Sequence, residues 1–384
     1  MKMEEMYYYW LHNVLGIGKI TFQKILKYMT PEELYKCTME KTSEFLTEKQ
    51  RENIIQSRKK WDIQKEWEML KKRNINLLIY GEETYPRKLA KISDPPILLY
   101  QKGKKDILDK PSVAVIGARA CSNYGSLAAK ELGRELANMG IVVVSGMARG
   151  IDGICQWASL ENKGESIGVL GSGVEVCYPP ENKRLFERLQ AEGCLISENP
   201  PFTTPNAGLF PLRNRIISGL ADVVVVVESR EKSGTLITVD MALEQGKEVY
   251  AMPGRITDSV SRGCNKLIKQ GAGLILSPRE FIEEICPMLQ RKYQKMGESQ
   301  NSVLQLKNQN SNIMLSLQLT QEENLIISIL DVSLKTIEEI YQLAKAELPE
   351  ITINKIMEIV LELQMKNILR EESGYYGLKV YCSK

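Results

Sequence analysis

The chain has 384 residues, of which 43% are hydrophobic and 26% are charged, and its formal net charge is +3 at pH 7. This balance is typical of a soluble protein with an apolar core, and a prior of about 150 residues per domain predicts two or three domains. A net charge this small does not by itself indicate a nucleic-acid-binding protein. Any basic surface must therefore be confined to one part of the molecule.

Several features argue against secretion, membrane insertion and many kinds of catalysis. The N-terminus lacks a signal-peptide pattern, and no run approaches the roughly 18 consecutive apolar residues of a membrane span. The eight cysteines are scattered without C-x-x-C pairs, which favours reduced thiols in the cytoplasm over disulfides or a zinc site. The only histidine is His12, which counts against many hydrolase mechanisms near neutral pH.

Residues 1–75 predict a helical domain, in which Trp61, Trp67 and Leu70 fall at helical spacing and fit core contacts. Within it, VLGIGK resembles the turn of a helix-hairpin-helix, whose amides at Gly16 and Gly18 bind a phosphate. The same short motif also occurs in helical domains that do not contact DNA. A short strand, INLLIY, then leads into a proline-rich stretch, and residues 76–110 are predicted to be a connector.

Residues 111–288 alternate apolar strands with helices. Near-continuous Val and Ile runs indicate strands that are buried on both faces, and hence a parallel sheet covered by helices. The predicted strands are SVAVIG, IVVVSG, SIGVLG, CLISE, DVVVVVE and EVYAMPG, with GLILS as a possible seventh. Glycines end four of them, at Gly117, Gly146, Gly171 and Gly254. Ligands bind beyond the carboxyl ends of such strands, so these glycines predict a binding edge.

The C-terminal part predicts a linker and a third domain. Residues 289–319 are rich in Gln, Asn and Ser, as linkers are. Residues 320–384 show three short amphipathic helices and two strand-like runs around a turn, which is winged-helix order. The third of these helices carries few basic residues, so contact with protein or dimerisation is favoured over reading a DNA groove.

Basic residues accompany the glycines at the predicted binding edge. They come from separate loops and are Arg119, Arg149, Arg213, Arg215 and Lys232. The chain has no G-x-x-x-x-G-K-[ST] loop, its G-S-G run does not complete a dinucleotide fingerprint, and no acidic cluster indicates a metal. Arginine and helix N-termini bind phosphate oxygens, so convergence of these loops predicts several phosphates in a row, as in a polynucleotide.

Each of these features has a plainer interpretation. A single Arg is commonly a solvated residue or the partner of a nearby acid. Ser233, Gly234 and Thr235 fit either an anion nest or a helix cap, and Phe210 fits either a base-stacking ring or a core residue. Asp152 and Glu198 are given structural roles, because no second acid or metal motif supports catalysis.

The blocks VAVIGARACSNYG, VVVSGMARGIDG, GVLGSGVEVCYPPEN, FPLRNRIISGLAD and VVVVESREKSGTLIT resemble the DNA-processing protein A family, also called Smf. The resemblance covers most of residues 80–285. It implies an α/β fold with an extended Rossmann-like, doubly wound and mainly parallel sheet. It also implies an N-terminal domain like a sterile alpha motif or helix-hairpin-helix, and a C-terminal winged helix.

The same resemblance implies a bacterial cytoplasmic protein, not an enzyme, that binds single-stranded DNA without ATP or any cofactor. Such a protein protects incoming DNA in natural transformation, loads a RecA-type recombinase and forms a homodimer through its Rossmann domain. The family also implies DNA contact at Lys183. With the residues above, the predicted DNA-binding set is Arg119, Gly146, Arg149, Gly150, Lys183, Phe210, Arg213, Arg215, Lys232, Ser233, Gly234 and Thr235.

One position departs from the family pattern, and two other functions stay open. Gln156 stands where the family usually has His, so a role that needs an imidazole is in doubt. The alternative to DNA binding is a Rossmann-type nucleotide or phosphoribosyl hydrolase with Glu244 or Asp152 as its acid. An adaptor whose winged helix binds protein is compatible with the first function.

Overall fold

The computed structural model describes residues 4–295, 320–330, 335–365, 369–372 and 375–378. The chain divides into two compact units, Met1–Leu306 and Lys307–Lys384. In the part that is described, no helix combines the length and the apolar character needed to cross a membrane.

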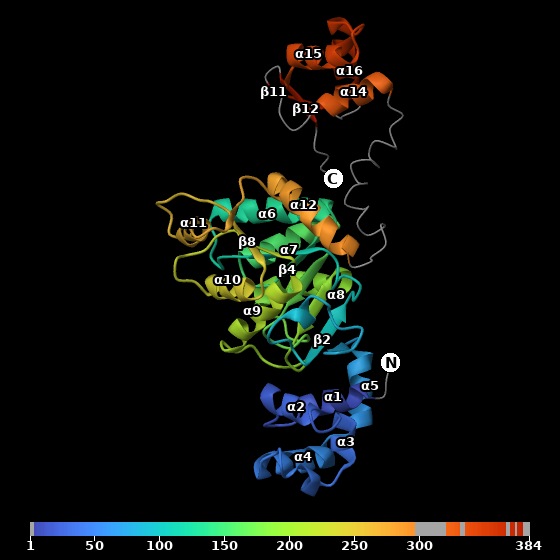
Figure 1. Cartoon of the computed structure of the whole chain (residues 1–384), viewed down its shortest axis with the longest axis vertical. Coiled ribbons are helices and arrows are strands. Elements are labelled where there is room, and N and C mark those ends of the chain that lie inside the picture. Colours follow the sequence, from blue (N-terminus) through green and yellow to red (C-terminus); the bar gives the residue numbers. More distant parts are fainter. Residues whose placement is uncertain (1–3, 296–319, 331–334, 366–368, 373–374, 379–384) are drawn as a thin grey trace. The chain divides into compact units, whose positions relative to one another are not determined.

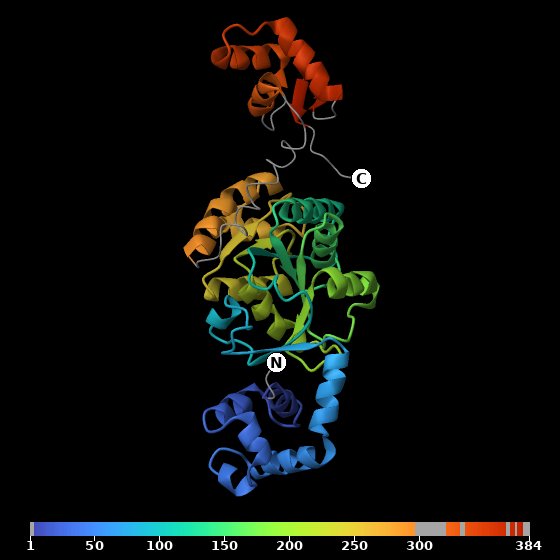
Figure 2. The ribbon, with the colours of Figure 1, turned by 90° about the vertical axis from the view of Figure 1, so that its right-hand side faces the viewer.

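The N-terminal region is helical, as predicted, and forms its own cluster in Figure 2, where α5 leads toward the sheet. Thr30 and Thr47 begin α3 and α4 with reciprocal capping boxes, and Asp62 caps α5. Trp10 and Phe22 are buried at its centre. The elements are α1 Glu5–His12, α2 Lys19–Leu26, α3 Pro31–Lys36, η1 Met39–Thr42, α4 Glu48–Lys60 and α5 Ile63–Lys72.

A mainly parallel sheet forms the centre of the first unit. Within the described residues it has nine strands in the order β1-β2-β6-β5-β4-β3-β7-β8-β9. All neighbours from β6 to β9 in this order are parallel. The strands are β1 Asn76–Ile79, β2 Leu98–Gly103, β3 Ser112–Ile116, β4 Val142–Ser145, β5 Ser166–Val169, β6 Cys194–Ser197, β7 Val223–Val226, β8 Glu248–Ala251 and β9 Gly273–Leu274.

The segment 76–110 differs from the expected connector, because it extends the sheet. Its strand β2 pairs antiparallel with β6, and β1 pairs antiparallel with β2. The prolines that predicted a connector lie outside both strands, at Pro86, Pro95 and Pro96. They therefore remove no donor from the ladder. A short 3-10 turn, η2 Leu89–Lys91, lies between the two strands.

Helices cover both faces of the sheet (Figure 1). Successive residues of β3 pack into different cores on the two faces of the sheet. Ala114 lies in the core that includes residues of α9, α10 and α11, and Val115 lies in the core that includes residues of α6, α7 and α12. The helices of this unit are α6 Asn123–Asn138, α7 Ile151–Glu161, η3 Pro180–Asn182, α8 Lys183–Glu192, α9 Leu209–Leu220, α10 Gly234–Glu244, α11 Arg262–Lys269 and α12 Pro278–Lys295.

The connections reverse direction beside β3. From β3 the chain passes through α6 to β4 on one side, and from β7 it passes through α10 to β8 on the other. Such a reversal opens a crevice beyond the carboxyl ends of the two strands, which is where open α/β sheets bind ligands. The loops after β3, β4, β5 and β7 meet at this edge.

The second unit has helices and a small sheet in the predicted order. Its elements are α14 Gln321–Ile329, β10 Lys335–Thr336, α15 Ile337–Glu347, α16 Ile353–Met365, β11 Leu369–Glu372 and β12 Tyr375–Leu378. In the described residues the sheet order is β10-β12-β11. The expected linker at 289–319 begins later, because α12 continues to Lys295. The rest of that linker, 296–319, lies outside the described residues.

Candidate nucleic-acid interface

The loops after β3 and β4 pass very close to one another. Gly150 allows this approach, since its φ is 71° and a Cβ there would lie 2.3 Å from the carbonyl oxygen of Ala118. The loop after β3 carries Arg119, which is exposed, and the loop after β4 carries Arg149, also exposed. Two basic side chains therefore come from neighbouring loops at the predicted edge.

The FPLRNR block is helical, although the sequence predicted a loop there. Helix α9 already begins at Leu209, and Pro211 lies in its first turn, where no intrahelical donor is lost. Arg213 and Arg215 therefore project from a helix and not from a loop. They are two positions apart, and residues with this spacing do not share a face.

Phe210 in the first turn of α9 forms the centre of a small pocket. The guanidinium carbon of Arg119 lies 5.6 Å from the Phe210 ring centroid, and the Tyr178 ring lies 5.5 Å away at an interplanar angle of 31°. This Phe210 pocket has a volume of about 40 Å³. Its lining residues are Arg119, Gly146, Ala148, Arg149, Tyr178, Pro179, Phe210 and Arg213.

Arg213 places a buried positive charge behind this pocket. Its Nη1 donates a hydrogen bond to the carbonyl oxygen of Gly146 at 2.7 Å and another to that of Val169. Burial lowers the pKa of Arg213 to about 10, although nearby Asp152 opposes the shift, so the guanidinium stays charged at neutral pH. The carboxylate of Asp152 accepts from the amide of Gly146 at 3.2 Å. It therefore has the structural role that the sequence predicted.

Arg215 is not brought to the Phe210 pocket. Its Nε lies 3.1 Å from Asp94 Oδ2, and its Nη2 lies 2.7 Å from Glu198 Oε1. Burial lowers the pKa of Arg215, but the two carboxylates outweigh this effect and raise it. The guanidinium is thus committed to acids of the protein itself, which is the plainer interpretation of a single Arg.

The chain is similar to known proteins in both sequence and structure. The model of the family described as DNA recombination-mediator protein A matches residues 76–286. The chain belongs to this family. DNA processing protein DprA of Bacillus subtilis is 43% identical over 216 residues, which are 56% of this chain and 73% of that protein. Its counterpart in Streptococcus pneumoniae is 43% identical over 203 residues, 53% of this chain and 72% of that protein.

Two solved structures of DNA processing protein A resemble this chain. The Streptococcus pneumoniae structure has a TM-score of 0.63 at 34% identity and covers 74% of this chain and 99% of its own. The Helicobacter pylori structure has a TM-score of 0.51 at 31% identity and covers 55% of this chain and 95% of its own. The Helicobacter pylori structure gives insight into the unique single-stranded DNA binding mode of that protein.

In this member of the DNA recombination-mediator protein A family, Arg149 and Lys183 lie in exposed ion pairs. Arg149 Nη2 is 2.6 Å from Glu181 Oε1, and Lys183 Nζ is 3.9 Å from Glu187 Oε1. Surface pairs of this kind contribute little free energy, about 0–1 kcal/mol. Both cations therefore remain available to an anionic ligand.

The segment from Lys232 to Thr235 does not line the Phe210 pocket. Ser233 is the N-cap of α10 and accepts from the amide of Thr235 at 3.1 Å, as the helix-cap interpretation predicted. The Thr235 hydroxyl donates to the carbonyl oxygen of Gly117 at 3.3 Å and joins the loops after β7 and β3. Lys232 and Gly234 are exposed at the same edge.

Gln156 braces the loop that carries Arg149. It is fully buried, its Oε1 accepts from the amide of Met147 at 3.0 Å, and its Nε2 donates to the Ser166 hydroxyl and the Ile167 carbonyl, both at 3.1 Å. An amide meets all three partners without titrating. In this chain the position that departs from the family pattern joins β4 and β5 inside the protein.

Sequence reasoning missed two residues of the interface, Tyr178 and Glu181. Both lie in the block CYPPEN, which was noted for its resemblance but not for its side chains. The acids suggested for a hydrolase are not brought together: Asp152 is buried against Gly146, and Glu244 is the last residue of α10, which leads to the amino end of β8. Among the described residues, no group of three or more His, Cys, Asp or Glu could hold a metal ion.

Proposed function

We propose that this chain is a single-stranded-DNA-binding recombination mediator that works without ATP. In this proposal it protects incoming single strands in the bacterial cytoplasm during natural transformation and loads a RecA-type recombinase onto them. The observation that carries the proposal is the Phe210 pocket, where an aromatic ring and the exposed Arg119 and Arg149 meet over the buried charge of Arg213. Family membership and the DNA-binding mode described for the Helicobacter pylori protein support it.

The chemistry of the pocket suits an unpaired strand better than a duplex. Any base can stack on an aromatic ring, and such stacking contributes about 1–3 kcal/mol per base, but only an unpaired base exposes its face. Arg119, Arg149 and Lys183 supply charge for the phosphates on the same edge. Each cation that neutralises a phosphate of a single strand changes the slope of log K against log salt by about 0.7.

The other parts of the chain receive roles in the same proposal. The N-terminal helices form a domain like a sterile alpha motif or helix-hairpin-helix, and residues 320–384 form a winged helix that contacts protein. A homodimer forms through the α/β domain. Within the described residues the sheet ends at β9, where Leu274 is 44% exposed, and Leu276 just after this strand is 73% exposed. An apolar sheet edge of this kind favours pairing with a second copy.

Fluorescence anisotropy with a labelled oligothymidylate and a matched duplex over a salt series tests the function. We expect the wild type to prefer the single strand with a steep salt dependence. Arg119→Ala should weaken binding and make the slope shallower by about 0.7, the effect of one phosphate contact. Arg279→Ala is the matched control, because Arg279 is an exposed residue of α12 that pairs with Glu283.

Three results would contradict the proposal. Binding that prefers the duplex, binding that does not depend on salt, or an Arg119→Ala variant that binds like Arg279→Ala would each remove its basis. Hydrolysis of a nucleotide by the wild type would instead favour the alternative function, a Rossmann-type nucleotide or phosphoribosyl hydrolase. Sedimentation of the full chain tests the homodimer separately, with Leu276→Ser as the variant expected to shift it toward monomer.

A further inference from the structure

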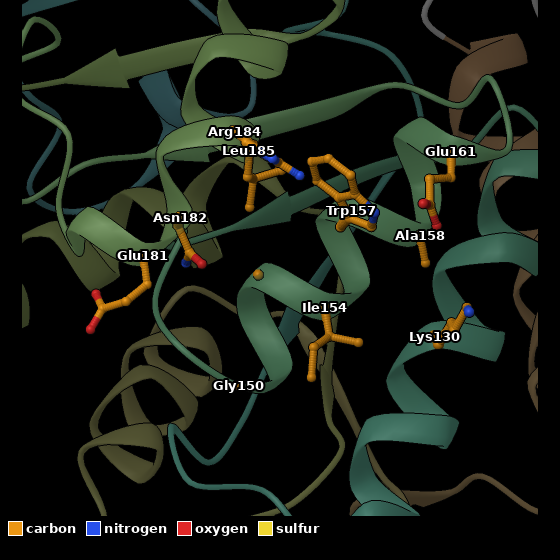
Figure 3. A pocket seen from close by; sticks show the side chains of 11 residues that line it. Lys130, Gly150, Ile154, Trp157, Ala158, Glu161, Glu181, Asn182, Arg184 and Leu185 are labelled. Carbon is orange, nitrogen blue, oxygen red and sulfur yellow. The ribbon is translucent and has the colours of Figure 1, made fainter.

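A larger cleft lies on the outer side of α7, between α6 and the η3–α8 segment (Figure 3). Its volume is about 430 Å³. Cavities that hold small ligands measure about 300–1,000 Å³, so this cleft has room for a nucleotide, whereas the Phe210 pocket at about 40 Å³ is much smaller. The residues used below are Lys130, Gly150, Trp157, Glu181, Asn182 and Arg184.

The cleft begins where the Phe210 pocket ends. Ala148 and Arg149 line the pocket, and the next residue, Gly150, lines the cleft. Asn182 of the cleft donates a hydrogen bond to the carbonyl oxygen of Ala148 at 3.1 Å. The ion pair of Arg149 with Glu181 joins one lining residue of each. A strand that leaves the pocket past Arg149 therefore enters the cleft next.

Trp157 provides an aromatic surface in this cleft. Its ring is partly buried, and the guanidinium of Arg188 lies over it at 5.5 Å from the centroid. Arg188 is itself held, because its Nη2 donates to the carbonyl oxygen of Leu160 at 2.7 Å. The indole is thus fixed in place before any ligand arrives, which lowers the ordering cost of stacking.

The charged groups of the cleft favour an anion. Lys130 from α6 and Arg184 from α8 are exposed, and neither forms an ion pair with another residue of the described part of the chain. Two acids, Glu161 and Glu181, also line the cleft, and Arg149 at its boundary pairs with Glu181. Three cations therefore face two acids around an aromatic ring, which matches phosphates on either side of a base.

We infer that the α7 cleft is a second nucleotide-binding site, which takes the unpaired bases that follow the one at Phe210. A base stacks on Trp157, and Lys130 and Arg184 contact the adjoining phosphates. The Arg149–Glu181 pair lies at the boundary, and a phosphate that passes there competes with Glu181 for Arg149. This inference rests on the proposed function, because it extends the same strand from the Phe210 pocket.

Binding of the full chain to oligothymidylates of about 4 to about 16 nucleotides tests the inference, since these lengths bracket the site sizes of single-strand binders. Trp157→Ala should weaken binding of the longest oligonucleotide by about 5- to 150-fold, the effect of one stacked base. The shortest should bind that variant as it binds the wild type. Phe210→Ala should weaken every length, and Trp157→Phe, which keeps a ring, should bind the long oligonucleotide nearly as the wild type does.

Intrinsic fluorescence gives a second readout that does not depend on how well the Ala variant folds. Trp10 and Trp67 are buried, and Trp61 is partly buried against the core of the N-terminal helical region, so stacking at Trp157 should account for most of the quenching when a long oligothymidylate binds the wild type. The quenching should be largely lost in Trp157→Phe while affinity is retained. Equal affinity of Trp157→Ala and wild type at all lengths would overturn the inference alone. Failure of the wild type to prefer single strands would overturn the proposed function as well.

Discussion

Arg215 and Asp94 form an ion pair, with Arg215 Nε 3.1 Å from Asp94 Oδ2, that connects α9 to the segment before β2. The other carboxylate oxygen of Asp94 accepts from Lys19 of the N-terminal helical region. Helix α9 holds Phe210 in its first turn. The orientation of the Phe210 pocket is therefore linked through one aspartate to the helices at the N-terminus.

The first prediction distinguishes a structural role of Arg215 from direct contact with DNA. Arg215→Ala removes the pairs with Asp94 and Glu198, so the free energy of unfolding should fall by about 2 kcal/mol, as for hydrogen bonds to charged groups. The slope of log K against log salt for an oligothymidylate should stay that of the wild type. Arg119→Ala should do the reverse, with an unchanged unfolding curve and a shallower slope. A shallower slope in Arg215→Ala would assign this residue to a phosphate.

The sequence predicted the sheet well for a physical reason. Strands buried on both faces need unbroken apolar runs such as Val223–Val226, and these runs are visible without any knowledge of their partners. The run INLLIY predicted β1, but β2 was missed, because flanking prolines mask a short strand whose pairing depends on the distant β6. The helical start of α9 was missed for a related reason, since Pro211 argues against a helix except in its first turn.

The candidate site was predictable only at the level of loops. Glycine-ended parallel strands place their loops at one edge, and this indicated Arg119, Arg149 and Phe210 correctly as neighbours. The position of the Arg215 guanidinium depends on its pairing with Asp94, which is 121 residues away in the sequence. Such long-range partners, like the buried carbonyl groups around Arg213, follow from tertiary packing and leave no local signal.

A second prediction concerns His12, the only histidine. It is buried, with Nδ1 3.0 Å from the Tyr100 hydroxyl, and burial lowers its pKa from 6.5 to about 4, opposed by the charge of Glu198. Below pH 6.5 the unfolded chain binds the proton and the folded chain does not. Stability should therefore fall by about 3 kcal/mol as the pH drops from 6.5 to 4, and this contribution should level off below pH 4.

Chemical unfolding of wild type and His12→Gln across this pH range measures the effect. Gln keeps a hydrogen-bonding group for Tyr100 but does not titrate, so subtracting the two curves cancels the other groups that ionise in acid. The difference in the free energy of unfolding between the two proteins should be constant above pH 7. Between pH 6.5 and 4 the wild type should lose stability relative to His12→Gln. A difference that is constant at every pH would show that His12 is solvated or protonated in the folded protein.

The third prediction concerns Asp222 at the start of β7. Its carboxylate lies 3.2 Å from Lys88 Nζ and 2.6 Å from Lys292 Nζ, and it accepts from the Tyr293 hydroxyl of α12 at 3.0 Å. Burial alone raises the pKa of Asp222, but the two lysines outweigh burial and lower it. Its contribution to stability is thus present above the ordinary pKa of 3.8 and is lost only as the pH falls through the lower folded value.

Asp222→Asn should lower the free energy of unfolding by about 3–5 kcal/mol at pH 7, because it leaves the buried ammonium of Lys88 without its acid. The deficit should persist to about pH 4 and shrink in stronger acid. Glu283→Gln on α12 is the control, since its pair with Arg279 is exposed and should contribute only about 0–1 kcal/mol. Equal effects of the two variants would contradict a buried ionic link between β7 and α12.

The last prediction tests whether the position of the Phe210 ring matters. A Cβ at Gly171, just beyond β5, would lie 2.7 Å from Phe210 Cδ1, closer than real contacts allow. Gly171→Ala should therefore displace the ring, at a cost in stability of about 1–3 kcal/mol, and weaken binding of an oligothymidylate by about tenfold. Gly208→Ala is the matched control, because a Cβ there meets only the Asn206 side chain at 3.6 Å. If Gly171→Ala binds the oligonucleotide like Gly208→Ala, the base does not stack on Phe210 in the orientation that the structure gives it.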